Sequence, residues 1–375
     1  MTESSSVELA WVGKTLGEYS NNDAFSVIDK NGDVISWGNR NLGGDNSSVA
    51  SKLKEISEIF SNEVAFAALK NDGSVVTWGL AEGGGDSSTV EDLVSSDVIN
   101  IFSTSASFLA VKEDGSVVTW GLKDAGGDSS KIDFSSGIHE IISASSSYAV
   151  LLKDNSIVTW GQPSLFVDFD NGKDIPIDRE KAQSNIKQIV SSDYAFAALK
   201  NDGSVFTWGG EKSGGDMSSV NDELSEGVLH LHSTRGGFIA IKDSGKIIIW
   251  DGDNSNYEYQ LENASFDDIE KIYSSEEAYA FLFKDGSVKS YGSAYKGGDI
   301  NHSEYGIESN KSLDSGVISV TASRLGFAAL KDDGSVVTWG ITYSNPGNEL
   351  ASSLSSNIKS IYSNRYSFAA LKDDG

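Results

Sequence analysis

The chain of 375 residues has no cysteine, which excludes disulfide frameworks, thiol nucleophiles and Cys-ligated zinc or iron–sulfur centres. Four His and two Met leave few soft ligands for any other transition metal. Basic residues are scarce too, because 29 Lys and Arg, only five of them Arg, stand against 55 Asp and Glu. With a formal net charge of −26, the chain is not expected to bind a nucleic acid backbone.

Long apolar runs are also missing. No apolar stretch approaches the ~18 residues that span a bilayer, so we expect no membrane insertion. The first residues, MTESSSVELAWVG, lack the basic start and the apolar run of a signal peptide. A chain without cysteine suits secretion and a reducing cytosol equally, so the localisation stays open, with a secreted or cell-surface protein slightly favoured.

A repeat of about 42 residues runs through the sequence. Its core is clearest as FAALKNDGSVVTWG at 66–79, FLAVKEDGSVVTWG at 108–121, FAALKNDGSVFTWG at 196–209 and FAALKDDGSVVTWG at 327–340. Eight copies have an aromatic anchor, which is Trp37, Trp78, Trp120, Trp160, Trp208, Trp250, Tyr291 or Trp339. A ninth, partial copy, FAALKDDG, occupies 368–375.

Each copy is typical of short β-strands. FAALK and SVVTW are rich in β-formers and are separated by N-D-G, D-D-G or E-D-G, which are hairpin turn signals. The turn Gly is replaced once, by Asn155, and Asn is the residue that best tolerates a positive φ there. A third, upstream strand appears as VINIFS at 98–103 and IKQIVS at 186–191.

Both faces of these strands are apolar, so each small sheet must be covered on both sides. Stacked blades meet this need, and the Ala positions permit close approach. We therefore predict an all-β fold, a β-propeller with mostly three-stranded blades, with eight complete repeats and a partial ninth. An unrecognised pair of β-sandwiches is the alternative.

The unit x-F-A-A-L-K-x-D-G-S-V-V-x-W-G resembles the regulator of chromosome condensation repeat, in a variant with short, three-stranded blades. It is also similar to the propeller-type β-lactamase inhibitory proteins of that superfamily. The resemblance covers roughly residues 14 to 375 and implies the propeller fold. It implies no single function, because the superfamily includes exchange factors, enzyme inhibitors and general interaction platforms.

We expect one repeat domain over residues 1–375, with an insertion between two blades at 162–185. Residues 1–13 are expected to close the domain or to link it to further sequence. VELAWV at 7–12 could supply the strand missing from the last copy; alternatively, the chain is cut from a longer array.

Several motifs allow chemical interpretations that the repeat itself argues against. G-D-S in GGDSS precedes the nucleophilic serine of some proteases, but it recurs and no His recurs near it to act as a base. An Asx-turn formed by the Asp is the simpler interpretation. His230 and His232 lie two apart on a strand without a visible third metal ligand, which favours a structural role. We predict no catalytic residue, no cofactor and no enzymatic activity.

Two acidic loops are weak candidates for calcium binding. DFDNGKD at 168–174 carries Asp168, Asp170 and Asp174, and WDGDNSNYEYQLE at 250–262 carries Asp251 and Asp253. Ordinary solvated acidic loops are the favoured alternative, because the second loop departs from the EF-hand pattern and is flanked by strands.

The best candidate site is a three-residue loop before the FAALK strand, which reads NND, NEV, TSA, ASS, SDY, TRG, SEE, SRL and NRY in the nine copies. This loop varies from copy to copy while the strands on either side of it change little, so we interpret it as having no structural role. Arg235, Arg324 and Arg365 occupy its middle position, and Tyr194 and Tyr366 the next one. Because Arg and Tyr are enriched at protein-binding hot spots, we predict a partner-binding surface here, with drift in an exposed loop as the alternative.

The predicted function is that of a non-enzymatic interaction module that binds another macromolecule, most simply a protein, through this loop face. The acidic field favours a basic partner. One alternative is a lectin-like propeller that binds carbohydrate between blades through Trp or Tyr. The other is a structural segment of a larger repeat protein.

Overall fold

The computed structural model describes residues 21, 23–162, 174–175, 177–178, 180–183, 185–251, 257–260, 268–300, 313–340, 354–363 and 368–375. These residues form nine antiparallel β-sheets linked by connectors with short 3-10 helices. The chain divides into two compact units, one of residues 1–201 and 207–211 and the other of residues 202–206 and 212–375. Within the described residues, no helix has the length and apolar character needed to cross a membrane.

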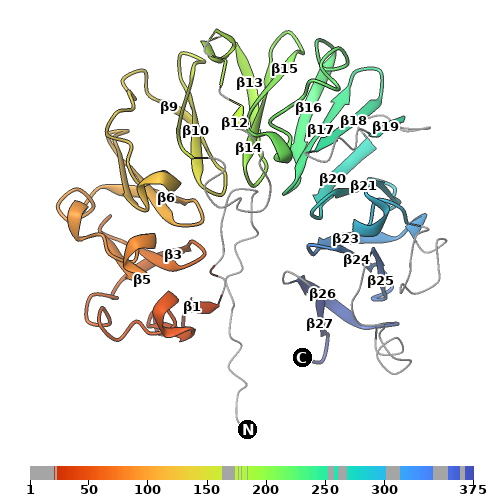
Figure 1. Ribbon diagram of the computed structural model, residues 1–375. Coiled ribbons are helices and arrows are strands. Elements are labelled where there is room, and N and C mark those ends of the chain that lie inside the picture. The colour runs from red at the N-terminus through yellow and green to blue at the C-terminus, as the bar shows by residue number, and fades with distance from the viewer. Residues whose placement is uncertain are drawn as a thin grey trace. The chain divides into compact units, whose positions relative to one another are not determined.

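The first five sheets follow the order of the chain, and Figure 1 shows β3, β6 and β9 in succession. Their strands are β1 (Ala24–Ile28) and β2 (Val34–Gly38); β3 (Ile56–Ser61), β4 (Ala65–Lys70) and β5 (Val75–Gly79); β6 (Val98–Ser103), β7 (Ser107–Lys112) and β8 (Val117–Gly121); β9 (Ile138–Ser143), β10 (Ser147–Leu152) and β11 (Ile157–Gly161); and β13 (Ile186–Ser191), β14 (Ala195–Lys200) and β15 (Val205–Gly210), with β12 (Asp174–Ile175) added beside β15.

The last four sheets repeat this plan. Their strands are β16 (Val228–Ser233), β17 (Gly237–Lys242), β18 (Lys246–Asp251) and β19 (Tyr257–Gln260); β20 (Ile269–Ser274), β21 (Ala278–Phe283) and β22 (Val288–Gly292); β23 (Val317–Ala322), β24 (Gly326–Lys331) and β25 (Val336–Gly340); and β26 (Ile358–Ser363) and β27 (Phe368–Lys372). The described 3-10 helices are η1 (Arg40–Leu42), η2 (Ala81–Gly83), η3 (Ser88–Val90), η4 (Lys123–Ala125), η5 (Lys181–Gln183), η6 (Glu211–Ser213) and η8 (Ala294–Lys296).

The hairpins form where the turn signals predict them. Asp72 Oδ1 accepts hydrogen bonds from the Ser74 N–H at 3.0 Å and from its hydroxyl at 2.6 Å, while the Gly73 N–H donates to the Lys70 carbonyl at 2.9 Å. Gly73 has φ +77°, and Asn155, the one substitute for a turn Gly, has φ +64°. The interpretation of Asn155 as a turn residue is therefore confirmed.

Within a unit, a sheet that lies between two others along the chain is covered on both faces, as β4 shows. Ala65, Ala67 and Leu69 of β4 pack against Ile101 and Phe108 of the following sheet. On the opposite face of β4, Phe66 and Ala68 pack against residues of the preceding repeat. The Ala side chains are completely buried and allow the sheets to approach closely. The fold is thus all-β with propeller blades, mostly three-stranded, and the predicted fold class is confirmed.

A hydrogen bond from the Trp indole ties each of five sheets to the connector before it. The Trp120 Nε1–H donates to the Gly84 carbonyl at 3.0 Å, and Gly84 is the first Gly of a G-G-D motif. The same bond, at 2.9–3.1 Å, joins Trp78 to Gly43, Trp160 to Gly126, Trp250 to Gly214 and Trp339 to Gly297.

The first Gly of each motif is needed for both its conformation and its lack of a side chain. Gly84 has φ +98°, and a Cβ on it would lie 2.7 Å from Cδ2 of Phe108, the ring that stacks on Trp120 with centroids 5.4 Å apart. The Asp of the motif closes the turn, since Asp86 Oδ1 accepts from the Ser88 N–H at 2.9 Å. This confirms the Asx-turn interpretation of G-G-D. The connector that follows Trp250 lacks the G-G-D motif. The sheet after this connector is the one whose anchor is Tyr291 instead of Trp.

Replacing Gly84 by Ala should destabilise the protein more than the same change at Gly115. Both residues have positive φ, +98° and +82°, but a Cβ at position 115 meets nothing within 4 Å. We expect Gly115→Ala to lower the free energy of unfolding by about 1–2 kcal/mol through backbone strain alone. Gly84→Ala should cost about 1–3 kcal/mol more, because the Phe108 ring must move. Urea denaturation of both variants measures the difference, and equal losses would contradict the proposed packing role.

Candidate functional site

The first residue of the variable loop is a buried cap. Asn62 Oδ1 accepts hydrogen bonds from the Val64 and Ala65 N–H groups at 3.0 and 2.7 Å, and its Nδ2 donates to the Gly83 carbonyl at 2.7 Å. Thr104 and Ser275 similarly donate to a carbonyl 21 residues later, each at 2.8 Å. This position therefore anchors the loop to the 3-10 helix of its own connector.

The loop backbones are hydrogen-bonded to one another from repeat to repeat. In the first unit, the Glu63 N–H donates to the Ser105 carbonyl at 3.1 Å, the Ser105 N–H to Ser145 at 2.8 Å, and the Ser145 N–H to Asp193 at 2.6 Å. In the second unit, the Glu276 N–H donates to the Arg324 carbonyl at 3.1 Å. The interpretation that the loop has no structural role is therefore wrong for its backbone. The loop side chains vary while these bonds are kept, and those at the middle position range from the buried Ser105 and Ser145 to the exposed Arg235.

Arg324, a predicted binding residue, forms ion pairs within the protein. Its Nε and Nη2 lie 2.6 and 2.5 Å from Glu276 Oε1, and the Lys296 Nζ lies 2.7 Å from Glu276 Oε2. The Glu276 side chain is only 16% exposed. Burial alone would raise the pKa of Glu276, but the hydrogen bonds from Arg324 and Lys296 outweigh it and lower the pKa. Arg324 thus joins two neighbouring loops, a role that its sequence position does not reveal.

Arg235 differs from Arg324 because its side chain is exposed. In the part of the chain that the structure describes, Arg235 forms no ion pair. Its loop is fixed beneath it, since Thr234 Oγ1 accepts from the Gly236 and Gly237 N–H groups at 3.2 and 3.1 Å. Tyr194 is half-buried, and its carbonyl accepts from the Gly210 N–H at 2.6 Å. Arg365 and Tyr366 lie outside the described residues.

The predicted calcium loops are only partly described. Asp174 pairs with Gly210 through the backbone in the β12–β15 ladder, and Asp251 pairs with Gly237 at the end of β18. Asp168, Asp170 and Asp253 lie outside the described residues. Among the residues that the structure describes, no three His, Asp or Glu side chains come together as a metal site.

His232 is half-buried on β16, where packing residues hold the equivalent position in other repeats. Burial, with a smaller contribution from His230, lowers the pKa of His232 to about 4. The imidazole is therefore neutral at physiological pH, in line with a structural role.

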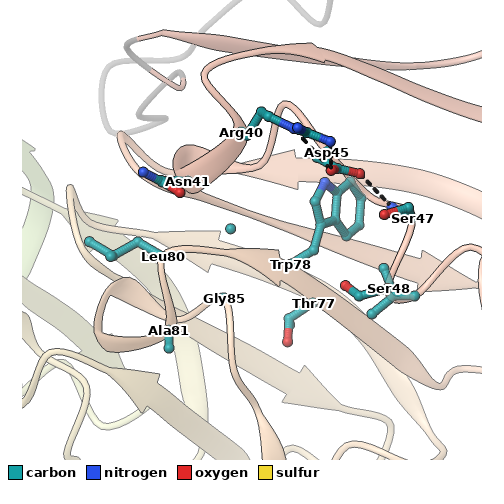
Figure 2. Close-up of a pocket in the computed structure, with 12 residues that line it drawn as sticks. Arg40, Asn41, Asp45, Ser47, Ser48, Thr77, Trp78, Leu80, Ala81 and Gly85 are labelled. Atoms are coloured by element: carbon teal, nitrogen blue, oxygen red, sulfur yellow. Dashed lines mark hydrogen bonds and ion pairs between the residues drawn. The ribbon is translucent and has the colours of Figure 1, made fainter.

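A cavity of about 740 Å³, which the sequence did not indicate, lies between the connectors after β2 and β5. Figure 2 shows Arg40, Asp45 and Ser47 linked along one side of it, while Leu80 and Ala81 come from the next connector. The Arg40 Nη2 lies 2.8 Å from Asp45 Oδ2. Hydrogen bonds from Ser47, together with Arg40, lower the pKa of Asp45 to about 2, so this carboxylate stays ionised.

The cavity offers polar groups at its rim and no platform for a sugar ring. Trp78 lines it but is only 3% exposed, and its indole is bonded to Gly43. The other anchors Trp120, Trp160, Trp208, Trp250, Tyr291 and Trp339 are buried as well. Stacking between blades, on which the lectin alternative depends, is not available at these seven anchors; Trp37, which is 45% exposed, is the exception.

Comparison with known proteins reveals distant structural likenesses. No protein-family model matches the chain, and no curated protein matches it either. Among solved structures, Prp20p from Saccharomyces cerevisiae, described with its binding to Gsp1p and histones, is 15% identical, with 88% of this chain and 83% of that chain covered and a TM-score of 0.38.

Two further structures illustrate the range of these likenesses. The ectodomain of the Physcomitrella patens receptor kinase CR4 is 13% identical, with 71% of this chain and 67% of that chain covered and a TM-score of 0.37. The β-propeller domain of Cps50 (Swd1) from Myceliophteria thermophila is 11% identical, with 77% of this chain and 97% of that chain covered and a TM-score of 0.30. Likenesses at this level concern the fold only, and no function is transferred from them.

Substituting Glu276 by Gln should destabilise the protein in a pH-dependent way. The folded-state pKa of Glu276 lies below its ordinary value of 4.5, so its stabilising effect is fully present above that value and disappears as the pH falls through the folded pKa. We expect Glu276→Gln to cost about 1–3 kcal/mol at pH 7 and much less at pH 3. Urea denaturation at both pH values measures this, with the exposed Glu226→Gln as the control. If the difference in unfolding free energy between Glu276→Gln and the wild type were the same at pH 3 as at pH 7, the role of the carboxylate would be contradicted.

Proposed function

We propose that this protein is a non-enzymatic interaction module that binds a partner protein through the loops that precede the second strand of each blade. The observation that carries the proposal is the exposed Arg235 side chain on a loop whose backbone is fixed. In that loop, Thr234 caps the turn and the Gly236 N–H donates to the Glu276 carbonyl of the next repeat at 3.2 Å. Because the loop backbone is already fixed, binding through this side chain does not require the loop itself to become ordered.

The loops that precede the second strand of each blade combine a fixed backbone with side chains that differ between repeats. The first residue of each loop anchors the turn, the backbone joins the neighbouring loops, and the middle side chain changes from repeat to repeat. Among the described residues, those at this position are Glu63, Ser105, Ser145 and Asp193 in the first unit and Arg235, Glu276 and Arg324 in the second. Ser105 and Ser145 are buried, and Glu276 and Arg324 form an ion pair. Of the described residues at this position, Arg235 is therefore the one whose exposed side chain can change at little cost to the fold.

Charge indicates the kind of partner. The net charge of −26 favours a protein with a basic surface, while Arg235 offers a planar donor for a carboxylate on that partner. Arg324 is less suited to this task, because the edge of its guanidinium group formed by Nε and Nη2 already bonds Glu276.

An enzymatic role has little to support it. The Ser of the G-G-D-S motif is part of the fold, since the Ser87 hydroxyl accepts from Thr77 Oγ1 at 3.1 Å, and the same contact recurs between Ser129 and Thr119 at 3.1 Å. A hydroxyl that is repeated and bonded in this way does not fit a unique nucleophile.

Site-specific photo-crosslinking tests which face binds a partner. A photoreactive amino acid at position 235 should form adducts with one protein from an extract of the source cells. The same amino acid at Asp243, an exposed turn at the other end of the β17 strand, is the matched control. Adducts that are equally abundant at both positions, or absent at 235, would contradict the assignment of the loop face.

A quantitative measurement with the captured and purified partner would then test Arg235 itself. We expect Arg235→Ala to weaken binding about tenfold, as is common for an interface Arg, without a change in melting temperature. Asp243→Ala should leave the affinity unchanged. An unchanged affinity for Arg235→Ala would exclude this residue from the binding site.

A further inference from the structure

The turn between β1 and β2 has an asparagine, Asn31, directly before its glycine, Gly32. In the other described turns where a glycine holds this position, the residue before it is Asp or, at one turn, Ser. An Asn-Gly step is chemically vulnerable, because glycine has no Cβ to keep its backbone nitrogen away from the asparagine side chain. The other Asn-Gly step of the sequence, at 171–172, lies outside the described residues.

The turn at Gly32 is held less firmly than several equivalent turns. The Gly73 carbonyl accepts a hydrogen bond from the Val98 N–H of the next repeat at 3.0 Å, and the same bond, at 2.9–3.0 Å, holds Gly203, Gly286 and Gly334. Within the described part of the chain, no such bond reaches the Gly32 carbonyl. Asn31 and Gly32 are exposed, and a Cβ on Gly32 would meet nothing within 4 Å. The bond described for the Gly32 N–H lies within its own turn, to the Asp29 carbonyl at 2.9 Å.

The side chain before the glycine also differs in its chemistry. In the next sheet, Asp72 Oδ1 accepts from the Ser74 N–H and hydroxyl, and these bonds lower the pKa of Asp72 to about 2. That carboxylate is therefore ionised, and an ionised carboxylate resists attack by a nitrogen nucleophile. The carboxamide of Asn31 is neutral, and its one described bond is from Nδ2 to Asp29 Oδ2 at 3.1 Å.

We propose that Asn31 is a site of spontaneous deamidation. The backbone nitrogen of Gly32 attacks Cγ of Asn31 and forms a new C–N bond. The bond from Cγ to Nδ2 breaks, and the amide nitrogen leaves as ammonia with the proton of the Gly32 N–H. Water then opens the resulting succinimide at either of its carbonyl groups, which leaves aspartate or isoaspartate at position 31. Water is the only co-reactant.

The modification alters the turn in which it occurs. The product has a carboxylate in place of the amide that donates to Asp29, so a hydrogen bond becomes a contact between two like charges. In the isoaspartyl product the backbone also gains a methylene group, inside the turn that the bond between Gly32 and Asp29 closes. Deamidation should therefore weaken the β1–β2 hairpin and leave the turns of the other sheets as they are.

Peptide mapping by mass spectrometry tests the proposal on folded protein kept in H₂¹⁸O at mildly alkaline pH. Asn31 should be converted to aspartate and isoaspartate that carry ¹⁸O. Because opening an exposed turn costs little free energy, the rate should lie within about tenfold of that of a synthetic peptide of residues 27–35. Asn71 and Asn201, which are exposed in the turns of two other sheets but precede Asp, are the internal controls and should stay intact.

Three outcomes would overturn the proposal. Asn31 could be protected by more than about tenfold relative to the peptide, which would mean that the turn holds it too firmly to react. The product could lack ¹⁸O, which would mean that it formed during digestion. Asn71 and Asn201 could react as fast as Asn31, which would mean that the Asn-Gly step confers no selectivity. An Asn31→Gln variant, whose longer side chain does not form the succinimide, should show no mass change in this peptide.

Discussion

The hydrogen bond from a Trp indole to the first Gly of a G-G-D turn is the constraint on which the described repeats depend most. It fixes the distance between each anchored sheet and the connector before it, and it demands a Gly because the Phe that stacks on the indole occupies the place of a side chain. The remaining elements of the repeat assist it. The Asp closes the turn, the Ala residues let the sheets approach, and the strand-end hydroxyl of Ser103 donates to the Ser61 carbonyl of the preceding repeat at 2.9 Å.

This rigid frame confines the variation of the loop to its side chains. The capping residue of the loop is buried and its backbone is bonded to the next loop, so a change at an exposed middle side chain such as Arg235 has the smallest structural cost. Under the proposed function, recognition depends on which side chains stand at the middle position of the loop. Where two of them have opposite charges and lie side by side, as Glu276 and Arg324 do, they stabilise the frame instead of serving recognition.

Local sequence signals were sufficient to predict the blades. Alternating apolar residues, D-G turns and the exception at Asn155 depend on neighbouring residues alone, so they can be recognised in one repeat and checked in the next. Contacts between repeats were beyond such reasoning. The ion pair of Arg324 joins residues 48 positions apart, and no local difference from Phe66 in the sequence indicates that Phe25 is 59% exposed. The cavity beside Arg40 likewise forms between two connectors.

Hydrogen exchange of the indole N–H groups, followed by NMR on protein with ¹⁵N-labelled Trp, tests the central role of the Trp–Gly bond most directly. The indoles of Trp78, Trp120, Trp160, Trp250 and Trp339 should exchange only when the fold opens, and should share a slow rate within each unit. Trp37, which is 45% exposed, should exchange quickly and serves as an internal reference. If the five buried indoles exchanged as quickly as that of Trp37, the bond would not be what holds the repeats together.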